Sequence, residues 1–559
     1  MLTRLGPPLT VLLLAGPIVA GLLGTILPAF GYLPALGGFT FSFDPFRQLF
    51  GQPGIWMSVL LSIATGLATT AASLTIVLVF VAGFAGTRLF GRIQHLISPL
   101  LSVPHAAAAF GLAFLIAPSG MIARMLSPEL TGWERPPDLL IVNDPMGLVM
   151  TIGLIVKEIP FLLLITLAAL PQVDLARSRL LAASLGYGRV AGFVLGPWPP
   201  IYRQVRLAVF AVLAFSTSVV DVAVILGPTT PAPLAVRLTA WMNDAELSTR
   251  FLASAGALLQ LAVTAAALLI WIGIERAGTW LRDNFAGAGK RFRHDRLAGA
   301  AGLGAMLLSA AAICGGLAVL GLWSIAGLWQ FPDALPAEVT GQTWVRAAPR
   351  IARPLETTLL AALFSTAIAT FLTLLCLVRE SETGRTIAGR GALALIYLPL
   401  IVPQVAFLFG LQLLFILGGA AGLPSLVLAH LVFVLPYVFL SLSDPWRAYD
   451  RRYEAVAAGF GKSRLTTLLR VRLPMLLRAV LTAAAVGFAV SIGQYLPTLL
   501  IGAGRLTTIT TEAVALGSGG NRRVIGVYAV LQSVLPSLAF LVATAVPSLI
   551  FRNRRAMRG

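Results

Sequence analysis

Long apolar runs, many of them 20 residues or more, recur along the whole 559-residue chain. A helix rises about 1.5 Å per residue, so about 20 apolar residues cross the ~30 Å hydrocarbon core of a bilayer. The runs lack the short alternating pattern of membrane β-barrel strands. The sequence therefore predicts an all-α polytopic membrane protein with about 12 transmembrane helices. The predicted spans lie near 8–30, 56–86, 95–118, 146–170, 202–226, 251–275, 300–328, 355–378, 391–417, 424–446, 476–502 and 524–551.

Composition supports this class, because 58% of the residues are apolar and only 11% are charged. Soluble domains carry about 25% charged residues, so a soluble enzyme or a disordered chain is excluded. The net charge of +19 would suggest nucleic acid for a soluble protein, but cytoplasmic membrane loops also collect Lys and Arg, so we expect no nucleic-acid partner. The two cysteines, Cys314 and Cys376, and four scattered histidines predict neither a disulfide nor a metal site.

The basic residues indicate the orientation of the chain. With the N-terminus inside, the cytoplasmic segments hold 29 of the 41 Lys and Arg residues, the outer segments hold 11, and Lys157 lies within a span. The positive-inside rule then places both termini in the cytoplasm. The run from Leu9 to Phe30 has no small-residue cleavage site, so we expect a retained first span. The cytoplasmic segments are 1–7, 87–94, 171–206, 276–299, 379–390, 447–478 and 552–559.

The two halves of the chain are related. Residues 103–112 (VPHAAAAFGL) and 402–411 (VPQVAFLFGL) share six residues at a constant offset of 299. The fifth spans also align, with Phe215, Ser218 and Asp221 matched to Phe488, Ser491 and Gln494. Both six-span halves start on the same side, so this is a parallel repeat. We divide the chain into a first six-helix half (1–275), a basic cytoplasmic linker (276–299) and a second six-helix half (300–559).

The cytoplasmic loop after the fourth span is long and basic in each half, at 171–206 and 447–478. Each loop has a small-residue helical turn, a glycine, an amphipathic stretch and, 13 residues after the glycine, a proline. Alanine favours helix, glycine permits a left-handed turn, and proline can begin the next helix. The pattern predicts a helix–turn–helix on the membrane surface that can dock into a groove of a partner. The residues concerned are Ala182, Ala183, Gly186, Phe193, Pro199, Glu454, Ala455, Ala457, Gly461 and Pro474.

These loops resemble the EAA loop (Glu-Ala-Ala, three residues, Gly, then a hydrophobic stretch to Pro) of permease subunits of binding-protein-dependent ABC importers. A fused pair of such six-span MetI-like units is similar to the permeases of thiamine and ferric-iron importers. The stretches 218–228 and 487–520 look closest to the YnjC type. The resemblance covers nearly the whole chain. It implies a multi-pass permease of the bacterial inner (plasma) membrane, which is a transport component and not an enzyme.

The resemblance also implies the partners. Each loop would be a coupling helix that inserts into one of two cytoplasmic ABC ATPase subunits, and a periplasmic or extracellular binding protein would deliver a small solute. This chain, surrounded by membrane lipid, would hold no cofactor, because ATP and Mg²⁺ would bind to the ATPase. The solute implied by the resemblance is thiamine-like or ferric iron. The first loop departs from the family with Leu180 and Leu181 in place of Glu-Ala, and Glu454 lies one position before the family's glutamate.

One short motif imitates a nucleotide site. Gly461-Lys462-Ser463 looks like the end of a phosphate-binding loop. That loop needs a glycine five residues earlier and a preceding strand, but position 456 is valine and the preceding stretch is helical. We therefore predict no ATPase site on this chain.

Three charged residues fall inside predicted spans: Lys157 and Glu158 in the fourth and Asp221 in the fifth. A charge at that depth costs about 2.5–3.5 kcal/mol, so these side chains should face the interior or a wet cavity. One interpretation is a Lys157–Asp221 or Lys157–Glu158 pair that joins two helices. The other is that Glu158 or Asp221 lines the translocation path, whose acidic wall would suit a cation. The candidate pathway residues are Lys157, Glu158, Asp221, Gln494 and Tyr495.

The segments that follow the fifth spans, 227–236 and 502–514, are predicted to face outside. Their Gly, Pro and Thr residues lie at the mouth of the predicted pathway. Arg505 and Glu512 are therefore candidate contacts for the binding protein, although ordinary capped loops would have the same composition.

Two other functions fit part of this sequence pattern. An ion-coupled secondary transporter also commonly has a parallel 6+6 repeat and would use Asp221 and Glu158, but it gives no reason for two matched surface loops. A membrane enzyme acting on lipid needs clustered His, Asp or Glu, which the sequence lacks. We interpret His105 as a polar packing residue, because Gln404 occupies the matching position.

Overall fold

The computed structural model describes residues 2–384, 390–517 and 519–552, and parts of the predicted segments 379–390 and 552–559 lie outside these ranges. Within them, nine helices are long and apolar enough to cross a membrane, and two bent helix pairs bring the number to eleven. The predicted span 202–226 is also helical, but Arg203 and Arg206 make the start of its helix less apolar. The all-α polytopic class is confirmed.

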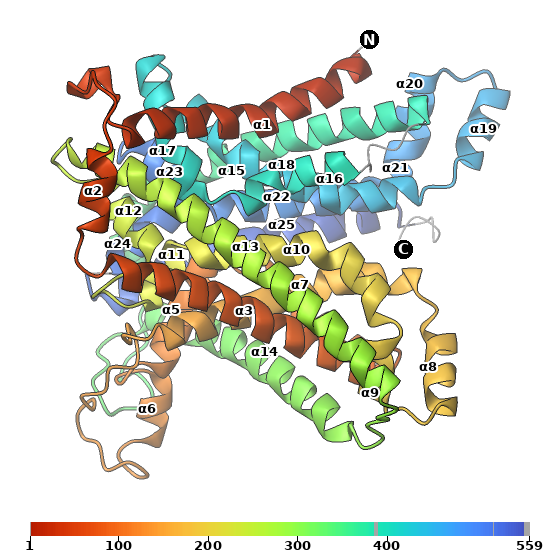
Figure 1. Ribbon diagram of the computed structural model, residues 1–559, viewed down its shortest axis with the longest axis horizontal. Coiled ribbons are helices and arrows are strands. Elements are labelled where there is room, and N and C mark those ends of the chain that lie inside the picture. The colour runs from red at the N-terminus through yellow and green to blue at the C-terminus, as the bar shows by residue number, and fades with distance from the viewer. Residues whose placement is uncertain (1, 385–389, 518, 553–559) are drawn as a thin grey trace.

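The long helices lie side by side between two ends of the molecule (Figure 1). The short helices α8 and α19 project at one end, called here the loop end, where α1 begins and α25 finishes. The short helices α2 (Asp44–Phe50), α12 (Leu234–Met242) and α24 (Ile509–Gly517) lie at the opposite end. The long helices of the first half are α1 (Leu2–Ala29), α3 (Ile55–Phe84), α5 (His105–Ile116), α7 (Leu148–Ala169), α10 (Trp198–Ser218) and α13 (Thr249–Gly287). Those of the second half are α14 (Arg296–Ile325), α15 (Gln342–Thr383), α16 (Arg390–Ile401), α17 (Gln404–Leu417), α18 (Leu423–Arg447), α22 (Leu477–Ile492) and α25 (Arg522–Ile550).

The repeated Val-Pro dipeptide breaks the third span of each half. α16 and α17 meet at an angle of 84° on the two sides of Pro403. In the first half, α4 (Arg88–Ile97) and the 3₁₀ helix η2 (Ser98–Ser102) precede Pro104, and α5 follows it. The residue before a proline is disfavoured in the helical region, so the motif ends one helix and starts the next. The expectation of a continuous helix over 95–118 and over 391–417 is therefore wrong.

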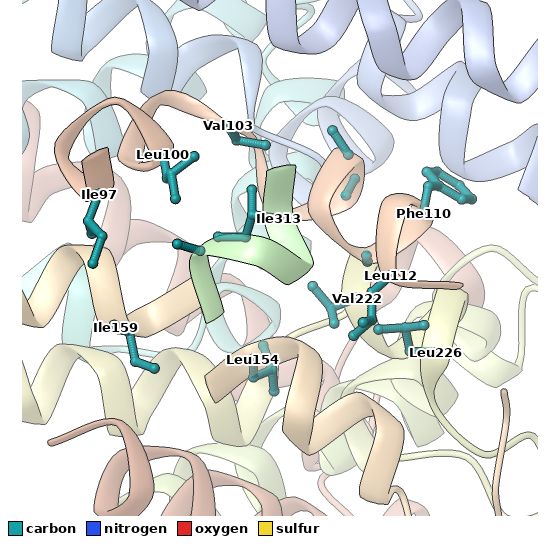
Figure 2. Close-up of a cluster of buried hydrophobic side chains, with 14 of the residues drawn as sticks. Ile97, Leu100, Val103, Phe110, Leu112, Leu154, Ile159, Val222, Leu226 and Ile313 are labelled. Carbon is teal, nitrogen blue, oxygen red and sulfur yellow. The ribbon is translucent and has the colours of Figure 1, made fainter. Parts of the chain in front are cut away.

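The first helix of each half packs mainly against the other half. α1 lies along α17 and α15, and α14 lies along α5 and α3. Figure 2 shows Ile313 of α14 among Leu154, Phe110 and other buried side chains of the first half. The two halves are interlocked rather than lying side by side.

The glycine of the repeated motif explains this close packing. Gly111 of α5 faces Gly316 of α14, and the matching Gly410 of α17 faces Gly21 and Gly24 of α1. A Cβ at Gly316 would lie 2.8 Å from the carbonyl carbon of Gly111, and one at Gly410 would overlap the carbonyl oxygen of Gly21. Only glycine permits this backbone approach, as is common where membrane helices cross.

Candidate functional site

The loop after α7 folds into two short helices, α8 (Leu175–Ser184) and α9 (Arg189–Leu195). It turns between them at Gly186, whose φ is +77°. The N–H groups of Gly186 and the next residue donate to the carbonyls of Ala183 and Ala182, both at 2.9 Å. This is the left-handed helix end that glycine favours.

The loop after α18 has the same local structure. α19 (Arg452–Gly459) turns at Gly461, whose φ is +69°, and α20 (Arg464–Thr467) follows. The N–H groups of Gly461 and the next residue donate to the carbonyls of Ala458 and Ala457 at 2.9 and 3.1 Å. The left-handed turn predicted at both glycines is therefore confirmed.

Each loop exposes a pair of large apolar side chains, one on its first helix and one at the residue that caps the end of that helix. The exposed fractions are 57% for Leu181 and 58% for Leu185, and 59% for Val456 and 78% for Phe460. Residues four apart lie on one face of a helix. Both pairs lie at the same distance before the turn glycine, at an offset of 275. Because α8 and α19 both lie at the loop end (Figure 1), these exposed side chains give the chain two matched apolar faces there.

Polar contacts fix the first loop to the rest of the molecule. Arg179 and Arg189 both donate to the carbonyl of Ala85 at the end of α3. Burial lowers the pKa of Arg179, and the nearby charge of Arg189 lowers it further. The carboxylate of Asp295 accepts the N–H groups of Arg189 and of the next two residues, at 3.1, 2.6 and 2.8 Å. Asp295 belongs to the segment between the halves, so this linker holds the start of α9.

We predict that Asp295→Ala loosens α9 without unfolding the chain. Three backbone N–H groups lose their acceptor, which costs about 0.5–2 kcal/mol for a helix start. Hydrogen exchange of the α9 amides should then be faster by about twofold to thirtyfold. Asp283→Ala is the control, because Asp283 is exposed and pairs only with its neighbour Arg282. Equal exchange rates in both variants would contradict the cap.

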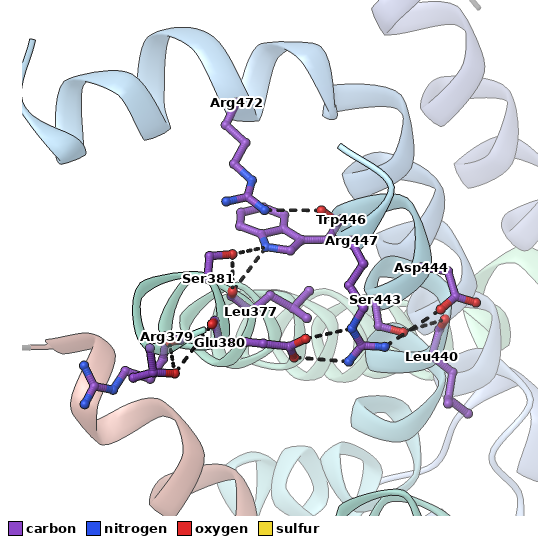
Figure 3. A network of polar contacts seen from close by, with 11 residues as sticks. Leu377, Arg379, Glu380, Ser381, Leu440, Ser443, Asp444, Trp446, Arg447 and Arg472 are labelled. Atoms are coloured by element: carbon purple, nitrogen blue, oxygen red, sulfur yellow. Dashed lines mark hydrogen bonds and ion pairs between the residues drawn. The ribbon is translucent and has the colours of Figure 1, made fainter. Parts of the chain in front are cut away.

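A buried arginine fixes the second loop (Figure 3). Arg472 stacks on the ring of Trp446 at 3.9 Å from its centroid and donates to the Trp446 carbonyl at 3.2 Å. Its other terminal nitrogen lies 2.9 Å from the carboxylate of Glu454. Trp446 in turn donates to the carbonyl of Leu377 on α15 at 3.1 Å. The second loop is thereby tied to both α18 and α15.

These contacts place the remaining loop residues. Glu454 pairs within its own loop, while Ala183 and Ala455 are exposed, Ala182 is half-buried and Ala457 is buried. Phe193 is buried in the core and not on the loop surface. Pro199 lies in the first turn of α10, and Pro474 lies in the short helix α21 (Leu473–Met475). Sequence analysis missed Asp295, Trp446 and Arg472, because their role depends on contacts between distant segments.

Neither predicted lysine pair is formed among the described residues. Lys157 donates to the carbonyls of Leu100 and Leu101 at 3.3 and 3.2 Å. These carbonyls lie in the last turn before the break of the third span, where the Leu100 carbonyl also accepts the N–H of Val103 at 3.3 Å, and the buried ammonium adds a donor to both. Glu158, which points about 100° away on the same helix, instead lies 3.1 Å from Nε2 of His105. The expectation of a Lys157–Asp221 or Lys157–Glu158 pair is therefore wrong.

Asp221 lies at a break in the fifth span, where α10 ends and α11 (Asp221–Leu226) begins. Electrostatic interactions link it to His105 and to Tyr495 of the second half. We call Glu158, His105, Asp221 and Tyr495 the polar cluster. Glu158 and Asp221 are buried, whereas 34% of the His105 side chain is exposed. The polar cluster thus joins the halves, and His105 and Tyr495 are its half-buried members.

The second half has the same break. α22 ends at Ile492, Gln494 follows, and α23 (Leu496–Gly502) begins after Tyr495. His430, which sequence analysis did not single out, bridges this break. Its ring nitrogens lie 2.8 and 2.9 Å from the hydroxyls of Ser491 and Thr498. The one sequence feature that could have identified His430 is that it is a single histidine within an apolar span.

The two predicted binding-protein contacts lie at the end opposite the loops. The helix α24 lies at that end (Figure 1). Arg505 is exposed in the turn before α24, and Glu512 is in the first turn of that helix. In the described part of the chain, no group of three or more His, Cys, Asp or Glu side chains gathers as a metal site would require.

Comparison with known proteins gives several relatives, although no family model matches the chain. It is 31% identical to the inner membrane ABC transporter permease protein YnjC of Escherichia coli K12, over 92% of this chain and 93% of that protein. It is 32% identical to the molybdenum transport system permease ModB of Mycobacterium tuberculosis, over 33% of this chain and 75% of ModB. It is 26% identical to the spermidine/putrescine transport system permease PotC of Haemophilus influenzae, over 32% of this chain and 70% of PotC.

Proposed function

The chain belongs to the inner-membrane ABC transporter permeases, and from this premise we propose that it passes a small solute between its two interlocked halves. A binding protein outside the membrane delivers the solute, and two separate ATPase subunits, which bind ATP and Mg²⁺, supply the energy. The chain itself carries no ATPase site. Arg505 and Glu512 lie at the end that the binding protein would meet.

The matched apolar faces on α8 and α19 carry this proposal. Four large apolar side chains are exposed at one end, in the same register and before identical turns. Each would contribute about 1.5–3 kcal/mol when buried against a partner. The contacts of Arg179 with α3, and of Arg472 with α18, would pass a rigid movement of the ATPase to the spanning helices. An ion-coupled secondary transporter would leave these faces without a role.

The division into 1–275, linker 276–299 and 300–559 also belongs to this proposal, with the loop end and both termini in the cytoplasm. The basic residues support that orientation, because most of them lie in segments of the loop end. The linker connects the two halves and also holds the first loop in place, because Asp295 accepts backbone N–H groups at the start of α9.

The polar cluster favours a cationic solute. Lys157 is occupied by backbone carbonyls, so Glu158 and Asp221 are left with His105 as their nearest basic group. A thiamine-like or polyamine cation fits an acidic wall, and PotC is named for spermidine and putrescine. Ferric iron needs more oxygen ligands than this cluster offers.

Purification of the tagged chain from its own cells in mild detergent tests the proposal. We expect an ABC ATPase to be recovered with it, and the binding protein encoded beside it to reveal the solute by mass spectrometry. Recovery of the intact chain alone, from membranes that still take up the solute, would contradict the proposal.

We predict that Asp221→Asn lowers uptake of that solute by about tenfold or more, because a buried charge-assisted contact is worth about 1.5–3 kcal/mol. The amount of assembled chain in the membrane should change less than twofold. Asp221→Glu, which keeps the charge, is the control and should retain more uptake. Parallel loss of uptake and of assembled protein would show that Asp221 only stabilises the fold.

A further inference from the structure

An open pocket of about 460 Å³ lies at the end of the molecule opposite the loops. It lies where α5 of the first half meets the end of α14 and the start of α25. The short helix α6 (Met121–Leu126) and the segment after α14 border it. Its polar lining is mainly arginine, and the residues that matter are Ser119, Arg124, Trp323, Asn521, Arg522 and Arg523.

Arg124 is buried beside this pocket, with only 4% of its surface exposed. Its Nε donates to the Ser119 carbonyl at 3.1 Å, and Nη1 donates to the carbonyls of Gln330 and Asp333 at 2.7 and 3.0 Å. Nη2 has no hydrogen-bond partner in the described part of the chain. Arg124 lines the pocket, and its unused Nη2 donor is open rather than fully enclosed, so it is available to an acceptor from outside the chain.

A second arginine, Arg522, lines the same pocket. The two terminal nitrogens of Arg522 donate to the carbonyl and hydroxyl of Ser119 at 2.9 and 2.6 Å. Arg124 and Arg522 both face the ring of Trp323, at 5.7 and 5.4 Å from its centroid. Like charges so close repel each other, and a shared anion would relieve the repulsion.

In the described ranges, the hydrogen-bond acceptors of Arg124 and Arg522 are neutral carbonyl and hydroxyl oxygens. No carboxylate lies within ion-pair distance of Arg124, Arg522 or Arg523, and Asp333 acts on Arg124 only from farther away. The pocket also includes Asn521, which caps the start of the 29-residue helix α25. The positive end of that helix dipole adds to the same field.

We propose that this pocket binds a phosphate-type oxyanion, and that the phosphate of an anionic phospholipid headgroup occupies it. The pocket lies at the ends of spanning helices, which is the level of the headgroups. Trp323 and Trp329 are buried against Arg124 in the wall of this region, and on α6, which also carries Arg124, Ile122 and Met125 are exposed as apolar side chains that can contact lipid. The bound phosphate joins α6 of the first half to α25 of the second. A free anion such as inorganic phosphate offers the same chemistry.

Native mass spectrometry of the full chain in mild detergent tests this proposal. Phosphatidylglycerol and phosphatidylcholine are added in equal amounts, with and without millimolar inorganic phosphate. We expect phosphatidylglycerol to be retained preferentially, and Arg522→Gln and Arg523→Gln each to lower its retention about fivefold, as loss of one basic side chain near a headgroup predicts. Arg124 is left intact, because three carbonyls depend on it.

Arg47→Gln is the matched control. Arg47 is an exposed arginine of α2, at the same end of the molecule but outside the pocket, so its loss should leave lipid retention unchanged. If inorganic phosphate binds and Arg522→Gln abolishes that binding, while neither lipid is preferred, the oxyanion site stands with the free anion as its occupant. Equal retention of both lipids without phosphate binding, or equal losses in Arg47→Gln and Arg522→Gln, would overturn the proposal.

Discussion

Aspartate at both Leu185 and Phe460 is expected to release the ATPase subunits from membranes that still contain the permease. Both side chains are exposed at the loop end and lie one residue before a turn glycine. If the two side chains are buried in grooves of the ATPase, replacing each one loses about 1.5–3 kcal/mol of binding free energy. Each new carboxylate also adds a desolvation cost when it is buried. We expect the ATPase retained on washed membranes to fall by more than about tenfold.

The control for this prediction keeps the side chains apolar. Leu185→Met with Phe460→Met preserves most of the buried surface and should retain the ATPase within about threefold. The permease level, measured by its tag, should be equal in all samples, because neither residue packs in the core. An ATPase level unchanged by the double aspartate variant would contradict docking at these two faces.

Alanine at Gly316 or Gly410 is expected to destabilise the interlocked halves. A Cβ at Gly316 would lie 2.8 Å from the carbonyl carbon of Gly111, and one at Gly410 would overlap the backbone of α1. The helices must move apart, at a cost of about 1–3 kcal/mol for overpacking. The melting temperature of the purified chain in detergent, and the amount of assembled chain, should both fall.

Gly315 provides a matched control one residue away on the same helix. A Cβ there would lie 3.8 Å from a side-chain methyl group of Leu115, which is ordinary contact. Gly315→Ala should therefore be neutral or slightly stabilising, because alanine favours helix by about 1 kcal/mol over glycine. Equal melting temperatures for Gly315→Ala and Gly316→Ala would show that the crossing of α14 and α5 is looser than described.

Features encoded locally could be predicted from the sequence. Apolar run length identified the class of protein, and the turn glycines, Gly186 and Gly461, have the positive φ that their pattern required. The repeated Val-Pro was recognised as a repeat, but its bend was not predicted. A hydropathy average over a whole span does not detect the break, because the break arises from the restricted backbone angles of the single residue before the proline.

Features that depend on distant partners could not be predicted. Nothing in the apolar pattern of α1 or α14 shows that each crosses to the other half, because lipid and helix faces are equally apolar. The sequence suggests a carboxylate as the partner of Lys157, but the lysine donates instead to two carbonyls at the end of the helix that breaks the third span. The pairing of Glu454 with Arg472 could be predicted only by knowing how the loop folds back on itself.

A photo-crosslinking amino acid placed at position 185 or 460 in living cells tests the central proposal most directly. Position 328, which is exposed near the end of the molecule opposite the loops, serves as the control. We predict that both loop positions, but not position 328, form adducts with an ABC ATPase subunit, and that mass spectrometry maps both to one groove. Functional chains that give no ATPase adduct from either loop position would contradict coupling through α8 and α19.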